Sequence, residues 1–201
     1  MKKLLLIVAA ALFLTACQES KEAKAEKLIK TALNTVIVNI DTYVPIGTSV
    51  DSAFAPVQTA ENLQRFGKMP LLIAQWGEFN RKAIIAKESM ALNEPPFTSM
   101  NKEIYNKEYE AAKERLDEIE KIMKAYADEM ERASKEKPVF NGYLARHQYR
   151  YVSIEGEKKI GDDIFFINKE FTAIEAMVDL ADEDMKAFIE ACGDNELFNF
   201  K

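Results

Sequence analysis

The chain has 201 residues, of which 48% are hydrophobic and 30% are charged, and its formal net charge at pH 7 is −6. This length and apolar content are sufficient for one domain with a sizeable core, and they exclude a disordered or fibrous chain. The acidic balance argues against nucleic acid as a partner, because binding to phosphate backbones needs clustered lysine and arginine.

The first residues have the layout of a bacterial export signal. Two lysines precede an unbroken apolar run from Leu4 to Leu14, which is too short to span a bilayer as a stable helix. Small residues follow this run. The pattern predicts a signal peptide over residues 1–16, which is removed on export; the alternative is a buried N-terminal helix that ends in cysteine.

The end of this segment, Leu14-Thr15-Ala16-Cys17, resembles the lipobox of bacterial lipoproteins. The resemblance implies that the thiol of Cys17 carries a diacylglycerol and that the chain is cut before this residue. Two or three acyl chains hold a protein on a bilayer far more firmly than one chain does. The mature chain would have a net charge of −8, because residues 1–16 contain two lysines and no acid.

The polar residues 17–24 are expected to form a lipidated tether. The residue after the cysteine, Gln18, is not the aspartate of an inner-membrane retention signal, so we expect the outer membrane, on its periplasmic face or at the cell surface. Acylation of Cys17 would leave Cys192 without a disulfide partner. The core alone must therefore hold the body, which we expect to be a single α+β domain over residues 25–201.

Apolar residues spaced three and four apart predict a first helix that begins at Ala25 and ends near Asp41. The stripe consists of Leu28, Ile29, Ala32, Leu33, Val36, Ile37 and Ile40. Prolines and a glycine follow, and they predict an irregular segment over residues 43–57.

Two longer helices are predicted next. The first has Thr59 as its N-cap and a kink or restart at Pro70, and the second runs from Thr98 or Ser99 to about Lys135. The first seam consists of Leu72, Trp76, Phe79, Ala83, Ala86 and Met90. The second seam consists of Tyr105, Tyr109, Ala112, Leu116, Ile119, Met123, Tyr126, Met130 and Ala133.

The linker between these two helices is short, so their seams should meet as an antiparallel helical hairpin over about residues 70–135. In the simplest interpretation the two seams form each other's core. Because the second helix is longer than the first, its last turns must cover another element of the chain, a protein partner or a second copy in a homodimer.

At Pro138 the spacing changes from helical to alternating, which predicts an antiparallel β-meander over about residues 138–178. One face of its first strand carries Tyr143, Ala145, His147, Tyr149 and Tyr151, and the other carries Arg146, Gln148 and Arg150. A C-terminal helix is predicted over about residues 182–192. Its apolar stripe consists of Met185, Phe188, Ile189 and Cys192.

Three stretches of the sequence resemble small lipoproteins of the Bacteroidetes. The resemblance implies the cell envelope as compartment and an α+β body, and it implies no particular activity. The stretches are Asp41-Thr42-Tyr43-Val44-Pro45 with Val50-Asp51-Ser52-Ala53-Phe54, Phe140-Asn141-Gly142-Tyr143 with His147-Gln148-Tyr149-Arg150, and Phe166-Ile167-Asn168-Lys169-Glu170-Phe171-Thr172.

The aromatic strand is the candidate binding face. His147 is the one histidine of the sequence, so any imidazole-based chemistry depends on it. The alternative is a structural role, in which His147 is hydrogen-bonded and packed between the sheet and the helices. The arginines of the strand, with Lys158 and Lys159, could receive an anionic glycan or an acidic partner, or form a solvated face. The candidate residues are Tyr143, His147, Tyr149, Tyr151, Arg146 and Arg150.

Other reactive residue types favour structural roles. Cys192 lies on an apolar stripe, which is more typical of a small buried hydrophobic residue than of a nucleophile. The acids Asp179, Asp182, Glu183 and Asp184 suit a helix N-terminus better than a calcium loop. The sequence lacks paired metal-ligand spacing, a phosphate loop and a nucleophile elbow, so we expect no metal and no cofactor.

The sequence therefore predicts a non-catalytic cell-envelope lipoprotein that binds a protein or a small ligand through the aromatic face or the hairpin. One alternative is an envelope hydrolase acting on cell-wall or glycan material, with Asp162 or Asp163 close to His147. That alternative requires a pocket that encloses His147 and a carboxylate at hydrogen-bonding distance. Another alternative is a self-associating helical spacer over residues 70–135.

Overall fold

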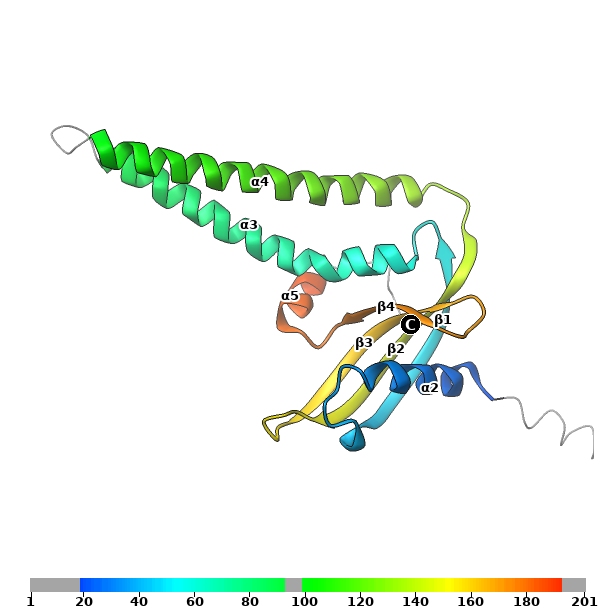
Figure 1. Ribbon diagram of the computed structural model, residues 1–201. Coiled ribbons are helices and arrows are strands. Elements are labelled where there is room, and N and C mark those ends of the chain that lie inside the picture. Colours follow the sequence, from blue (N-terminus) through cyan, green and yellow to red (C-terminus); the bar gives the residue numbers. More distant parts are fainter. Residues whose placement is uncertain (1–18, 93–98, 193–201) are drawn as a thin grey trace, which may run out of the picture.

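The computed structural model describes residues 19–92 and 99–192, without the side chains of Ser99, Met100 and Cys192. Within these ranges the fold is α+β, as the sequence predicts: an antiparallel sheet lies between one helix on one face and a helical hairpin with a short helix on the other (Figure 1). The expected signal peptide and Cys17 lie outside the described residues.

The sheet has the strand order β1-β2-β3-β4, and each neighbouring pair is antiparallel. The predicted meander over residues 138–178 is confirmed by β2, β3 and β4, which follow one another in the chain. The four strands are β1 (Val44–Ala55), β2 (Val139–Val152), β3 (Lys158–Asn168) and β4 (Ile174–Asp179).

Strand β1 corrects the prediction of an irregular segment over residues 43–57. Pro45 and Gly47 flank a bulge, and a second irregularity separates Ala53 from Phe54. Among the described strands, β1 lies at the edge of the sheet and pairs with β2 alone. An edge strand tolerates proline because one side of its backbone needs no ladder partner. Pro45 and Gly47 therefore mark one bulge in β1 and do not interrupt the strand.

Helix α2 (Lys21–Leu33) packs across one face of the sheet (Figure 1). It begins inside the predicted tether, because the side chain of Ser20 caps it by accepting a hydrogen bond from the amide of Ala23 at 3.1 Å. The core on this face consists of Ala25, Ile29, Leu33, Ile37, Tyr43, Ala145, Tyr149, Phe165 and Ile167.

The first helix ends at Leu33, earlier than the predicted end near Asp41. The chain must turn back after this residue to enter β1, and it does so through turns and a short 3₁₀ helix, η1 (Ile40–Thr42). Ile37 stays buried in these turns, whereas Val36 is exposed. The apolar spacing in the sequence continues past Leu33 because Ile37, in the turns after α2, packs into the same core as the helix.

The second face of the sheet is covered by the start of α3 (Ala60–Leu92) and by α5 (Glu183–Cys192). A Cβ atom on Gly67 would lie 2.8 Å from Val178 of β4, so this glycine allows the helix to approach the sheet closely. Asp182, from the acidic run, caps α5 by accepting the amide of Met185 at 3.0 Å. The core here consists of Ala53, Leu63, Phe66, Leu144, Ile164, Phe166, Ala176, Val178 and Met185.

Helices α3 and α4 (Ser99–Ala133) form the predicted antiparallel hairpin, which projects beyond the sheet as an arm (Figure 1). Thr59 caps α3 as predicted, with its hydroxyl 3.1 Å from the amide of Asn62. Pro70 lies inside α3, and Figure 1 shows the helix changing direction along its course. Within the described ranges, the length and apolarity that a membrane-crossing helix needs do not occur together in any helix.

Candidate functional site

The aromatic face predicted on β2 lies beneath α2. Tyr149 and His147 are buried, and Tyr143 and Tyr151 are half-buried and pack against the core that α2 completes. The rings of His147 and Tyr149 stack with centroids 5.5 Å apart, and Tyr43 lies 5.8 Å from His147. The aromatic side chains of the predicted face therefore form a packed layer between helix and sheet.

His147 is the packed, hydrogen-bonded histidine that sequence analysis offered as the alternative. Its side chain is fully buried. Its Nε2 lies 2.6 Å from the hydroxyl of Tyr43, and its Nδ1 lies 2.8 Å from the hydroxyl of Thr48. Burial lowers the pKa of His147, which favours the neutral ring. The imidazole of His147 thus connects β2 to Thr48 of β1 and to Tyr43, the residue immediately before β1.

Asp163 lies directly opposite His147 in the register of β2 and β3. The hydroxyl of Tyr149 donates to Asp163 Oδ2 at 2.8 Å, and both ring nitrogens of His147 lie against other hydroxyl groups, those of Tyr43 and Thr48. Burial raises the pKa of Asp163 to about 7, and the nearby carboxylate of Asp179 acts in the same direction, against the hydrogen bond from Tyr149. The histidine–carboxylate hydrogen bond that the hydrolase alternative needs is thus absent from this cluster, where each group takes a hydroxyl.

The arginines of the candidate face lie on the opposite side of β2. Arg146 donates through Nε and Nη2 to the two carboxylate oxygens of Asp162, at 2.8 and 2.7 Å. Gln148 also donates to Asp162, at 2.9 Å. Burial alone would raise the pKa of Asp162, but these donors lower it. The charge of Arg146 is therefore compensated within the chain, and Arg150 is the exposed arginine of the pair.

Gly161 of β3 is the position where the aromatic layer leaves no room for a side chain. A Cβ atom there would lie 2.2 Å from Cζ of Tyr149. We predict that Gly161→Ala lowers the free energy of unfolding by about 2 kcal/mol, because the buried ring must move away from Asp163. Urea denaturation measures the change. Gly47→Ala is the control, since a Cβ atom on Gly47 meets nothing within 4 Å; equal effects of the two changes would contradict the packing argument.

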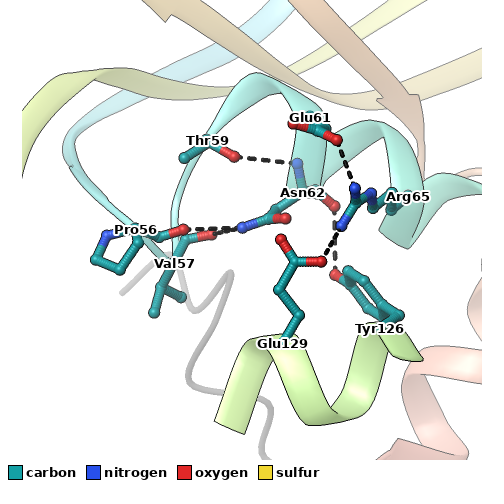
Figure 2. A network of polar contacts seen from close by, with 8 residues as sticks. All are labelled: Pro56, Val57, Thr59, Glu61, Asn62, Arg65, Tyr126 and Glu129. Carbon is teal, nitrogen blue, oxygen red and sulfur yellow. Dashed lines mark hydrogen bonds and ion pairs between the residues drawn. The ribbon is translucent and has the colours of Figure 1, made fainter. Parts of the chain in front are cut away.

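A second buried polar site lies at the root of the hairpin (Figure 2). The side-chain amide of Asn62, which is 5% exposed, donates to the carbonyl oxygens of Pro56 and Val57, each at 2.9 Å. Its backbone amide donates to Thr59, and its carbonyl oxygen accepts the hydroxyl of Tyr126 at 3.3 Å. Asn62 therefore connects the turn that follows β1, the first turn of α3 and the helix α4.

Arg65 completes this root (Figure 2). Its guanidinium forms ion pairs with Glu61, one turn earlier in α3, and with Glu129 of α4. Sequence analysis did not single out Asn62 or Arg65. The available signal was the Thr59 cap with a short polar residue three positions later, which indicates a helix start but not the long-range partner on α4.

The arm beyond the root has two unlike surfaces. On α3, Ala83 and Ala86 are buried in the seam, and helix geometry places the exposed side chains of Ile84 and Leu92 on the side away from α4. On α4, most exposed residues are charged. A groove of about 650 Å³ lies between the helices, and its lining includes Phe79, Lys82, Ile85, Ala86, Ala112 and Arg115. The exposed apolar residues of α3 are Leu71, Ile73, Ile84, Ile85 and Leu92.

No family model matches the chain, and no curated protein or solved structure is significantly similar to it. Among residues 19–92 and 99–192, no three or more histidine, cysteine, aspartate or glutamate side chains are grouped so that they could hold a metal ion.

Proposed function

We propose that the chain is a lipoprotein of the bacterial cell envelope, anchored to the outer membrane through acylated Cys17, and that it acts without catalysis by binding a protein. The signal pattern over residues 1–16 and the cysteine that follows it support the anchor. The hairpin of α3 and α4 is the binding element in this proposal.

The observation that carries the choice of the hairpin is the apolar outer face of α3. A surface helix normally directs its large apolar side chains toward a core, yet α3 projects from the body with isoleucine and leucine side chains exposed beside charged ones. The aromatic face of β2 offers no comparable surface because α2 covers it. A protein partner on the outer face of α3 would remove these exposed apolar side chains from water.

Photo-crosslinking in intact cells tests the proposal. A photoreactive amino acid in place of Ile84, on the outer face of α3, should give a defined covalent adduct on illumination. The same amino acid in place of Lys121, which is exposed on α4, serves as the control and should give little adduct. A fatty-acid analogue supplied to the cells should label the adduct, and Cys17→Ser should abolish the label.

Two results would overturn this function. Equally weak crosslinking at positions 84 and 121 would show that the hairpin is not the binding element. A chain that takes up no fatty-acid label, or that keeps residues 1–16, would remove the anchor.

A further inference from the structure

We propose that the partner of the hairpin is a second copy of this chain, with the outer faces of the two α3 helices packed antiparallel about a twofold axis between Ile84 and Ile85. This inference rests on the proposed function, since it names the occupant of the same surface. It commits to one register, which the positions of apolar, charged and small residues on α3 determine.

The residues of the proposed contact form one stripe along the helix. At 100° per residue, the stripe is centred roughly opposite the seam that faces α4. Ile84 is 48% exposed and Leu92 is 84% exposed. Ile85 also lines the groove between α3 and α4, and 56% of its surface stays exposed. Among the described residues, helix α3 has a partner on one side only in this part of the arm. The stripe consists of Gly77, Arg81, Ile84, Ile85, Glu88 and Leu92.

A twofold axis between Ile84 and Ile85 pairs unlike residues in a complementary way. The two isoleucines of one copy meet those of the other at the centre. One turn outward on each side, Arg81 of one copy lies opposite Glu88 of the other, and the symmetry repeats this pair. In the part of the chain that the structure describes, neither Arg81 nor Glu88 lies within ion-pair distance of an opposite charge, and the charge of Arg81 contributes to the lowered pKa of Glu78. Opposite charges at this position favour the antiparallel register.

The same register places Leu92 of one copy over Gly77 of the other. A Cβ atom on Gly77 would meet nothing within 4 Å, so the glycine leaves a depression in the exposed face of α3. Glycine inside an exposed helix costs about 1 kcal/mol relative to alanine, and it is better explained where another chain approaches closely. Gly67 is an example within the body of the protein, because the side chain of Val178 occupies the space that a Cβ atom on this glycine would need.

The antiparallel direction also suits the rest of the molecule. Each arm extends away from its own sheet, so the two bodies lie at opposite ends of the pair (Figure 1). Four helical turns form a small contact compared with the roughly 1,200 Å² of a stable interface, so we expect weak association in solution. Anchoring both copies in one membrane raises their effective concentration, and the dimer should predominate there.

Charge reversal tests the register with the full-length protein reconstituted in lipid vesicles. Arg81→Glu and Glu88→Arg should each weaken dimerisation about tenfold, because each places like charges opposite one another at both symmetric positions. The double variant should restore it. Lys113→Glu, an exposed change on α4, is the control for altered net charge. A double variant as weak as the single ones would overturn the register.

Disulfide crosslinking tests the axis in the same vesicles, in a Cys192→Ser background. Ile84→Cys should crosslink to its own copy, because the twofold axis passes beside this residue. Leu92→Cys should not, because the twin residue lies about 22 Å away in the antiparallel pair, although it would be adjacent in a parallel pair. A defined crosslink in cells at position 84 to a different protein, without any dimer, would refute the second copy and keep the proposed function.

Discussion

Asn62→Asp should lower the free energy of unfolding by about 4 kcal/mol at pH 7. The amide of Asn62 is 5% exposed and donates to the carbonyl oxygens of Pro56 and Val57. An aspartate there has no proton to donate when ionised, and it brings a negative charge against two carbonyl dipoles in a buried site. Urea denaturation followed by circular dichroism measures the loss.

Gln64→Glu is the matched control, because it makes the same change from amide to carboxylate two residues along α3. Gln64 is exposed and its amide donates to the carbonyl oxygen of Glu175 at 3.2 Å. We expect a loss below about 1 kcal/mol, since water replaces the lost donor. If both variants unfold at the same urea concentration, the buried amide does not hold the root of the hairpin.

The root and the outer face of the arm have separate roles. Asn62 and Arg65 fix where α3 leaves the sheet, and they lie in the part of the helix that the body covers. The seam between α3 and α4 is formed farther out, by residues such as Ala83 and Ala112. A root variant should therefore lower stability, whereas charge reversal at Arg81 or Glu88 should change association and leave the stability of the monomer nearly unchanged.

The elements that sequence analysis predicted correctly are those whose pattern is local. The spacing of Leu72, Trp76 and Phe79 along α3 depends only on helix geometry and an apolar neighbour. The alternation in β2 was equally informative, because α2 covers one side of the strand. The hairpin, the meander and the C-terminal helix followed from such patterns.

The features that the sequence did not predict depend on contacts between distant segments. Strand β1 needs β2, about a hundred residues later, to compensate for Pro45 and Gly47. The partners of His147 are Tyr43 and Thr48, which belong to a segment that was predicted to be irregular. The separation of Arg146 from the aromatic side chains was predicted, because it depends only on the alternation along β2, whereas its partner Asp162 on β3 was not.

Asp163→Asn should change the pH dependence of stability between about pH 4 and pH 7. In the folded chain the pKa of Asp163 is raised to about 7 by burial, whereas an unfolded aspartate titrates near its ordinary value of about 3.9. Between these values the folded state holds a proton that the unfolded state has released. The contribution of Asp163 to the stability of the wild-type chain therefore falls as the pH rises through this window, by up to about 4 kcal/mol, and is constant above it.

The amide that replaces the carboxyl group of Asp163 in this variant does not titrate, and its carbonyl oxygen can still accept the hydroxyl of Tyr149. The variant should lack the decrease in the free energy of unfolding that Asp163 causes in wild type. The free energy of unfolding of the variant minus that of wild type should therefore increase from pH 4 to pH 8. The lowered pKa of His147 has the opposite sign, since a histidine buried as the neutral form adds stability as the pH rises toward 6.5. That contribution is present in both proteins and cancels in the difference.

Urea denaturation at intervals of pH, on wild type and Asp163→Asn, measures this difference. Asp51→Asn removes a carboxylate from the exposed edge strand β1 and should give a curve parallel to wild type. A curve for Asp163→Asn that is also parallel to wild type would mean that Asp163 is ionised in the folded core. In that case the hydroxyl of Tyr149 would have to compensate for a buried negative charge, which a single neutral donor at 2.8 Å does poorly.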